Sequence, residues 1–457
     1  MNRWGWRGAL ASSIILVGCQ ETVDCDAISL VSHDGPISSL QWSTQNEAVT
    51  SVQFSAVGAE PANTECLPGV ESDEGSQNHE HFLVGIPENT EVEYVATTHL
   101  DGEAQSCEGS FVTGVWSDNM PEYEVTFVDS DADMAPFILM ANAGYGRSHV
   151  VLLNRQGDVL WTMGADDRTI VTQVVFDVDG PGLIYLAQDA SRESEELSTL
   201  VTGSWSQEEL ERQTVVGAHH KFDQLDDGSL VFIATDIRDW IDPESGETES
   251  VVGDKLLILK PDGVLEEFVS VWDLMEVEKH GRWQIEYFPD KKDWTHGNGI
   301  DYDADRNSYM WSLANLDAVI ELDADSGEVL SMFGEDYSGF SEDSDVFNYQ
   351  HDAKWTENGT ITMTTVEGYT YALEYEVDAA TGELHEIWSY GYGERIFSPI
   401  LGEVHLLANG NRVVVWGTGA LVQELDPDGE LIWELTGNTG KDMYSSVRMV
   451  RDLYAGR

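Results

Sequence analysis

The sequence predicts an all-β protein, with a small N-terminal β-sandwich followed by a six-bladed β-propeller. Three observations predict this fold: short segments of alternating polar and apolar residues near the N-terminus, a strand-turn-strand unit that recurs along the rest of the chain, and Asp, Asn and Gly at the turns. The chain has 457 residues, of which 41% are hydrophobic, so it is long and apolar enough to bury a large core.

Acidic side chains dominate the charge of the protein. There are 84 Asp and Glu residues against 23 Lys and Arg, and the formal net charge is −61. A surface of this sign repels the phosphate backbone of nucleic acids and anionic lipid headgroups, so no nucleic-acid partner is expected. Because the carboxylates occur in almost every predicted loop, we interpret them as a solvated surface suited to salty water rather than as an acidic site.

The N-terminus is typical of a targeting segment, predicted as a signal peptide over residues 1–18. Arg3 and Arg7 form a basic start, and residues 9–17 are an apolar run too short to span a bilayer. The run ends in a Leu-Val-Gly-Cys stretch that resembles the lipobox of bacterial lipoproteins. The resemblance implies lipid modification of Cys19, membrane contact through that lipid only, and a periplasmic or cell-surface location at the outer membrane. An ordinary secretory signal is the alternative.

A short tether and the β-sandwich are predicted next, over residues 19–27 and 28–130. Alternating segments such as 39–43 and 92–96 are separated by Gly, Pro and Asn turns. The stretch 85–94 resembles the corner of fibronectin type III domains, which implies an accessory module of that kind.

Cysteines and histidines in this first quarter of the chain are candidates for structural or metal chemistry. An oxidising compartment favours a Cys66–Cys107 disulfide with Cys25 left over, although spacing alone leaves the connectivity open. His79 and His81 flank a Glu, and a His-Glu-His strand on an acidic surface is interpreted as exposed. Metal binding by this pair is the less favoured alternative.

A repeat determines the predicted fold of residues 131–457. One hairpin recurs at 153–161, 259–265, 322–330, 377–384 and 425–433, and a second at 179–185, 227–232, 307–311, 358–362 and 409–414. Their Asp or Asn and Gly residues favour the positive φ angles that tight turns between paired strands require. Two hairpins make four strands, and units of roughly 40–60 residues are typical of propeller blades. Five units are complete, and segment 137–140 with the tail after Lys441 is predicted to make the sixth.

Three histidines occupy matching places in this repeat. His220 and His351 each precede the turn glycine of their unit by eight residues, and His296 fits the same offset if its turn is longer. The first strand of each propeller blade lines the central channel, so the three imidazoles are predicted to meet at one mouth. Such a cluster can bind a metal, or can combine a nucleophile with groups that stabilise developing negative charge. The sequence leaves both hypotheses open, a metal site and a nucleophilic site.

The residues around two of these histidines resemble those of a known family. Residues 296–301 read His-x-Asn-x-Ile-Asp, and residues 350–353 read Gln-His-Asp-Ala. Both stretches are similar to motifs of the bacterial aryl sulfotransferases, which are lipid-anchored or periplasmic enzymes that do not use the nucleotide sulfate donor PAPS. The resemblance covers most of the chain after the signal, and it implies the same order of β-sandwich and six-bladed propeller.

The resemblance also implies a reaction. It is a ping-pong transfer, without a cofactor, of a sulfuryl group from an aryl sulfate ester to a phenol through a sulfated histidine. His351 matches the nucleophile, while His296 and His220 would hold the sulfuryl oxygens or protonate the leaving phenolate. The expected substrate-binding residues are Asn298, His219, Lys354 and Arg395. Homodimerisation is left open.

One position departs from the family pattern. Family members carry an Arg at the channel, where this chain has Ala314. The candidates for a replacement cation are Arg147, Lys221, Lys354, Arg395 and Arg448. The departure keeps two alternatives open: a non-catalytic cell-surface propeller that binds an aryl ligand or a glycan, and a metal-dependent enzyme that uses the same histidines. The tryptophans Trp294, Trp311 and Trp355 are candidates for the walls of a phenol site, although packing is their favoured role.

Overall fold

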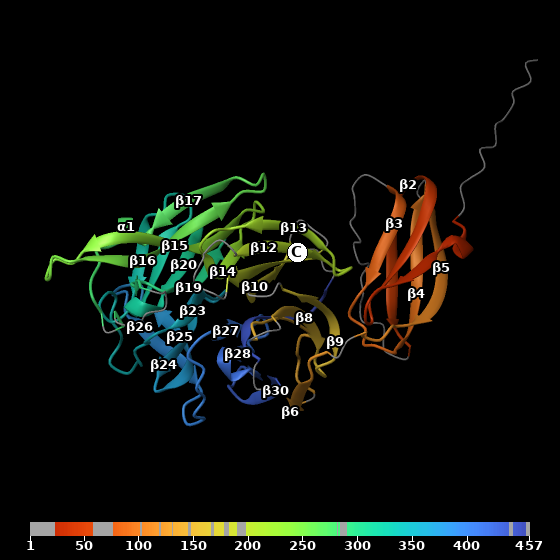
Figure 1. Ribbon diagram of the computed structural model, residues 1–457. Coiled ribbons are helices and arrows are strands. Elements are labelled where there is room, and N and C mark those ends of the chain that lie inside the picture. The colour runs from red at the N-terminus through yellow and green to blue at the C-terminus, as the bar shows by residue number, and fades with distance from the viewer. Residues whose placement is uncertain are drawn as a thin grey trace, which may run out of the picture.

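The computed structural model is all-β and consists of an N-terminal part and a larger propeller-like part (Figure 1). It describes residues 23–57, 76–100, 103–117, 120–129, 131–144, 148–165, 169–177, 182–189, 198–280, 282–283, 290–437 and 442–453. The predicted all-β class is thus confirmed. None of the helices within these ranges is long and apolar enough to cross a membrane.

The N-terminal part is built around one long strand. Its strands are β1 (Ser29–Ser32), β2 (Ser38–Ala56), β3 (Ser76–Leu83), β4 (Glu91–Leu100) and β5 (Glu103–Val112). The first half of β2 pairs with β1 and β3 and its second half pairs with β4, so the two halves form different faces of one core. Leu40, Trp42 and Phe54 are among the buried residues of this core. The likeness to fibronectin type III domains stays a prediction.

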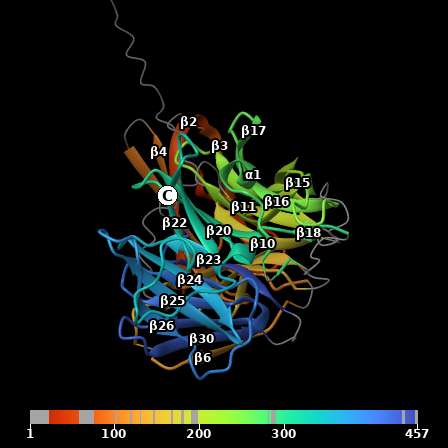
Figure 2. The same cartoon turned by 90° about the vertical axis from the view of Figure 1, so that its left-hand side faces the viewer.

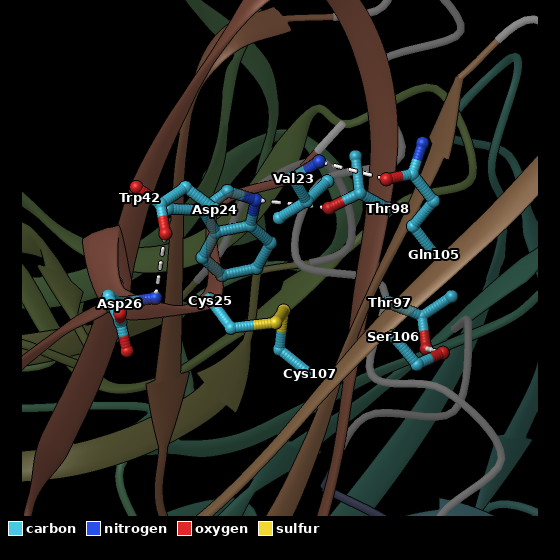
Figure 3. Close-up of a disulfide and its surroundings, with 10 residues drawn as sticks. All are labelled: Val23, Asp24, Cys25, Asp26, Trp42, Thr97, Thr98, Gln105, Ser106 and Cys107. Carbon is cyan, nitrogen blue, oxygen red and sulfur yellow. Dashed lines mark hydrogen bonds between the residues drawn. A yellow bond between two sulfur atoms is a disulfide. The ribbon is translucent and has the colours of Figure 1, made fainter. Parts of the chain in front are cut away.

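A disulfide joins the start of this part to β5 (Figure 3). It links Cys25, in the short 3-10 helix η1 (Cys25–Ala27), to Cys107, with a Cα–Cα distance of 5.4 Å. The expected Cys66–Cys107 bond is therefore wrong, and Cys66 itself lies outside the described residues. The physical reason is visible nearby: the Val23 amide donates to Gln105 Oε1 at 2.8 Å, which lays the N-terminal segment along β5.

The expected exposure of His79 and His81 is also wrong. Both side chains are buried, because alternate residues of β3 face the core. His81 stacks on Trp42 with 5.3 Å between ring centroids, and its Nε2 lies 2.8 Å from Thr50 Oγ1. Burial, with a smaller effect of His79, lowers the pKa of His81 to about 4, so this imidazole is neutral near pH 7.

Six sheets of four or five strands form the propeller-like part (Figure 2). The first three contain β31 (Tyr444–Val450), β7 (Phe137–Asn142), β8 (His149–Asn154) and β9 (Val159–Gly164); β10 (Thr169–Phe176), β11 (Gly182–Asp189), β12 (Thr199–Ser204) and β13 (Glu209–Thr214); and β14 (Ala218–Gln224), β15 (Leu230–Ile241), β16 (Thr248–Leu259) and β17 (Leu265–Ser270), with β18 (Lys292–Asp293) beside β16. The helix α1 (Val271–Leu274) follows β17.

The other three sheets continue in chain order. They contain β19 (Gly297–Asp303), β20 (Ser308–Leu313), β21 (Ala318–Asp323) and β22 (Val329–Phe333); β23 (His351–Trp355), β24 (Thr360–Glu367), β25 (Tyr369–Val377) and β26 (Leu384–Tyr390); and β27 (Glu403–Leu406), β28 (Arg412–Trp416), β29 (Leu421–Leu425), β30 (Leu431–Gly437) and β6 (Tyr123–Phe127). The first strands of consecutive sheets contact one another, from β31 through β10, β14, β19 and β23 to β27.

The turns within these sheets have the predicted chemistry. In the hairpin between β29 and β30, Asp426 Oδ1 accepts hydrogen bonds from the amides of Asp428 and Glu430, and Gly429 has φ = +87°. A side-chain acceptor at the start of the turn and a glycine at its left-handed position fix the two-strand register. The repeat therefore marks hairpins, as predicted.

Strands from both ends of the chain complete two of the sheets. The C-terminal strand β31 pairs with β7, as the sixth unit of the repeat predicts. Strand β6, within the range assigned to the sandwich, pairs with β30, and the two lie together in Figure 2. The N-terminal part packs directly on this framework, since Trp116 Nε1 donates to Val159 O at 3.1 Å and Ile37 shares a core cluster with Leu139.

Candidate active site

The structure brings the three matching histidines together. His220 lies in β14, His296 directly precedes β19, and His351 begins β23, so each stands at the first strand of one of three consecutive sheets. The His220 ring centroid is 5.1 Å from that of His296 and 6.0 Å from that of His351. All three side chains are buried.

Irregularities in the backbone of the first strands orient these histidine side chains. The pairing register of each first strand shifts beside its histidine, between Ala218 and Phe222 in β14, and likewise in β19 and β23. His220 and His296 have φ angles of +58° and +50°, in the left-handed region that residues with a Cβ rarely adopt. Such bulges redirect side chains at a cost of about 1–3 kcal/mol for each strained residue. Strain at matching places in two sheets is typical of a functional site.

His351 presents an unprotonated ring nitrogen. Its Nδ1 lies 3.0 Å from the carbonyl oxygen of Gly402, which can only accept, so Nδ1 carries the proton and Nε2 keeps a lone pair. That Nε2 is buried and has no hydrogen-bond partner in the described part of the chain. Burial, helped by the Lys221 charge, lowers the pKa of His351 to about 4. The imidazole is therefore neutral near pH 7 and able to act as a nucleophile.

His296 is held by a carboxylate. Its Nδ1 lies 2.6 Å from Asp293 Oδ2, an arrangement that stabilises positive charge on the imidazole. Its ring stacks on Tyr349 with 6.1 Å between centroids, and the Arg282 guanidinium covers Tyr349 at 5.0 Å. Arg282 in turn donates to Asp317 Oδ2 at 2.9 Å. Arg282 and Asp293 were not predicted, because the segment between β17 and β19 lies outside the repeat.

His220 has a histidine and a carboxylate behind it. Its Nδ1 lies 2.8 Å from His219 Nδ1, and His219 Nε2 lies 2.9 Å from Asp254 Oδ1. Burial, with a smaller contribution from neighbouring positive charge, holds the pKa of His220 well below its usual range. Burial alone would raise the pKa of Asp254, but hydrogen bonds, first that from His219, lower it, so Asp254 is ionised. Asp254 lies in the third strand of its sheet and was not predicted.

The other predicted substrate-binding residues take different places. Asn298 is buried and donates from Nδ2 to Gln350 O at 2.8 Å, so it ties the His296 segment to the residue before His351. Lys354 lies three residues beyond His351 and pairs with Asp352 Oδ2 at 2.7 Å. Arg395 lies on the exposed loop between β26 and β27, and within the described ranges no hydrogen bond or ion pair joins it to the histidines.

The position of the absent family Arg adjoins the site. Ala314 is fully buried, and its amide donates to the His296 carbonyl oxygen at 3.2 Å. Among the candidate cations, Lys221 is next to His220 in β14, and its Nζ bonds to Glu403 Oε1, to Gln173 Oε1 and to Ser445 O. Arg448 lies 3.5 Å from Glu403 Oε2, and Arg147 falls outside the described residues.

The tryptophans serve packing. Trp294 and Trp311 are almost fully buried in one core cluster, and Trp355 donates from Nε1 to Glu321 Oε1 at 3.2 Å. In the part of the chain that the structure describes, no three His, Cys, Asp or Glu side chains are grouped as a metal site.

Comparison with protein families decides the relationship. The sequence model of the arylsulfotransferase (ASST) family matches residues 124–449. The chain belongs to the arylsulfotransferase family. The match begins in β6 and ends in β31, so it covers all six sheets of the propeller-like part and the two strands that join its ends. The family predicted from the two motifs is confirmed.

Solved structures with a similar course of the chain are more distant. A 6-phosphogluconolactonase described as putative, from Bacteroides fragilis, matches with TM-score 0.41 and 12% identity over 70% of this chain and 99% of its own. A periplasmic gluconolactonase of Pseudomonas aeruginosa has TM-score 0.38 and 12% identity over 69% and 98%. A streptogramin B lyase has TM-score 0.37 and 9% identity over 69% and 88%. Among curated proteins no sequence matches.

Proposed function

We propose that this arylsulfotransferase moves a sulfuryl group from an aryl sulfate ester to a phenol, without PAPS, through a sulfated His351. The observation that carries the proposal is the His351 Nε2 atom, which is buried, unprotonated and unpartnered in the described part of the chain beside two further histidines. A neutral imidazole whose other nitrogen is fixed by a carbonyl oxygen is a prepared nucleophile. Nothing in the contacts of the cluster favours metal chemistry or ligand binding alone.

In the first half-reaction, His351 Nε2 forms a bond to sulfur while the bond from sulfur to the aryl oxygen breaks. The electron pair of that bond leaves with the phenolate, and His296, protonated and held by Asp293, gives it a proton. The Nδ1 proton of His351 stays in its hydrogen bond to Gly402 O, which supports the positive charge that the ring gains. The product is an N-sulfo histidine and a free phenol.

Lys221 supplies positive charge next to the nucleophile in place of the absent family Arg. Its Nζ is buried among acceptors and adjoins His220 in sequence, and its charge acts on His351. A fixed cation in a buried site stabilises the negative charge that develops on the sulfuryl oxygens and the leaving oxygen.

The framework and location follow as parts of the same proposal. The six sheets form a closed six-bladed propeller whose channel mouth holds the histidines, and the N-terminal part is a fibronectin-III-like accessory module. Cys19 carries a lipid that anchors the protein at the outer membrane, on its periplasmic or cell-surface side. Replacement of Cys19 with Ser tests the anchor, since the variant should leave the membrane fraction.

We also propose that two copies of the chain pair as a homodimer. Size-exclusion chromatography with light scattering tests this pairing.

A rapid-mixing experiment with 4-nitrophenyl sulfate tests the reaction. Without an acceptor, the enzyme should release a burst of 4-nitrophenolate equal to the concentration of active sites, because the sulfated enzyme accumulates. Addition of phenol should then restore continuous turnover. Peptide mapping under alkaline conditions should find the sulfuryl group on the peptide that contains His351. Failure of all tested aryl sulfates to give a burst would exclude this function.

A further inference from the structure

His220 is the first of three buried side chains that are joined by hydrogen bonds, followed by His219 and Asp254. Asp254 lies in β16, its Oδ1 contacts His219 Nε2 at 2.9 Å, and His219 Nδ1 contacts His220 Nδ1 at 2.8 Å. All three side chains are buried. The other carboxylate oxygen, Asp254 Oδ2, accepts from Thr295 Oγ1 at 2.5 Å and from the Gly297 amide at 2.6 Å. Both donors belong to the segment that carries His296, so Asp254 bridges two sheets.

The local backbone is built for this approach. A Cβ atom at position 297 would lie only 3.0 Å from Asp254 Oδ2, so glycine is what allows the carboxylate to reach the amide. The parallel pairing of β16 with β18 sets Val252 opposite Asp293, and the Trp294 amide donates to Val252 O at 2.8 Å. The paired strands β16 and β18 thus position both carboxylates. Asp293 in β18 contacts His296, and Asp254 in β16 contacts His219.

With both imidazoles neutral, the hydrogen bonds leave one arrangement of protons. A carboxylate only accepts, so the proton of neutral His219 is on Nε2 and its Nδ1 holds a lone pair. The contact between the two Nδ1 atoms needs one proton, which must then belong to His220. Neutral His220 therefore has an unprotonated Nε2, in a ring that lies between His296 and His351.

We propose that Asp254, through His219, keeps the Nε2 atom of His220 free of a proton, so that His220 acts as the general base for the acceptor phenol. This inference rests on the proposed function and divides the two half-reactions between two histidines. His296, directly bound to a carboxylate, donates to the leaving phenolate, and His220 accepts from the incoming phenol. Asp254 touches no substrate and is a positioning residue.

The second half-reaction then balances. The phenol oxygen forms a bond to sulfur as its proton passes to His220 Nε2, and the bond between sulfur and His351 Nε2 breaks, with its electron pair returning to that nitrogen. His220 now holds the proton that His296 has lost. Their ring centroids are 5.1 Å apart, so transfer back to His296, directly or through one water molecule, restores the starting state.

Replacement of Asp254 with Asn tests the inference. The oxygen of the amide must stay toward the two donors, Thr295 and the Gly297 amide, so its NH2 group faces His219 Nε2. His219 Nε2 then accepts, so the proton of neutral His219 moves to Nδ1. His219 Nδ1 donates to His220 Nδ1, and the proton of His220 moves to its Nε2. The burst of 4-nitrophenolate should keep its amplitude and change its rate by less than about 3-fold. Turnover with phenol as acceptor should fall about 10- to 100-fold.

The acceptor series separates positioning from a structural defect. Electron-poor phenols that are already ionised at the assay pH have no proton to give, so the loss in Asp254→Asn should shrink toward none along the series from phenol to these acceptors. An equal loss for every phenol, or a lost burst in a folded variant, overturns the inference. The matched control is Glu321→Gln, which makes the same change at a buried carboxylate that contacts Ser308 and Trp355 instead of a histidine, and it should show no dependence on the acceptor.

A second variant keeps the test decisive if Asp254→Asn does not fold. His219→Phe cuts the chain between Asp254 and His220 and should give an acceptor-dependent loss of its own. Combining both changes should cost no more than His219→Phe alone, because both act through one chain. Additive losses contradict the inference. Absence of any burst in the unaltered enzyme would instead refute the proposed function, so the two failures are distinguishable.

Discussion

Two groups of buried histidines in this chain share their burial but differ in their neighbours. His79 and His81 in β3 contact Thr50 hydroxyl oxygen and the Trp42 ring, and no carboxylate hydrogen bond to either is seen in the described residues. In the propeller-like part, His296 contacts Asp293, and His219 contacts Asp254.

The difference teaches what turns a core histidine into a candidate catalyst. Burial alone makes an imidazole neutral, as the pKa of about 4 for both His81 and His351 shows. Chemistry needs, in addition, a partner that fixes which nitrogen carries the proton and neighbours that can take or give one. The site has both features, whereas the N-terminal pair has only packing and hydroxyl contacts.

The largest expected effect belongs to His351, the proposed nucleophile. His351→Ala should abolish the 4-nitrophenolate burst and sulfuryl transfer, because the proposed covalent intermediate forms on this imidazole. Rapid mixing and steady-state assays measure both. A variant that still gives a full burst would assign the nucleophile elsewhere, with His220 as the first candidate to map.

A smaller loss is expected at the carboxylate behind His296. Asp293→Asn removes the negative partner of the ring that we propose as the acid, so the burst rate should fall about 10- to 100-fold. The loss should be greater for phenyl sulfate than for 4-nitrophenyl sulfate, since the poorer leaving group needs more help from the acid. A uniform loss across leaving groups would point to damaged structure and not to lost acid catalysis.

The two groups should behave alike in the pH dependence of stability. His81 and His351 each have a folded pKa lowered to about 4, in both cases chiefly by burial, so the unfolded chain binds more protons between pH 6.5 and 4. Their contribution is complete above pH 6.5 and is lost as the pH falls toward 4, by roughly 1–2 kcal/mol each at pH 5. Urea unfolding at pH 7.5 and 5 measures this, and a stability that rises on acidification contradicts it.

The smallest effect on activity should come from the N-terminal pair. His81→Phe keeps a ring against Trp42 and loses the contact to Thr50 Oγ1, which should cost about 1 kcal/mol of stability and leave the burst unchanged within about 2-fold. The same variant should weaken the pH dependence of unfolding. A loss of burst comparable to that of Asp293→Asn would show that the two groups are coupled.

Sequence reasoning recovers what repeats and misses what does not. The hairpin units and the strand supplied by the C-terminus follow from the repeat, and the meeting of His220, His296 and His351 follows from their matching places within its units. Asp254 and Asp293 were missed because they reach the site across strand pairing, from β16 and β18, where no spacing in the sequence marks them. The Cys25–Cys107 bond and the burial of His81 likewise depend on which strands become neighbours.

The position of β31 has a consequence for the timing of activity. The carbonyl oxygen of Ser445 in β31 accepts a hydrogen bond from the Lys221 ammonium, and the Val447 amide donates one to Glu403. Strand β31 therefore lies against the charged groups beside His351. His351 precedes this strand by more than ninety residues, yet its electrostatic surroundings are incomplete until β31 has been synthesised and has paired with β7. The growing chain thus carries His351 in unfinished electrostatic surroundings until β31 has taken its place in the sheet.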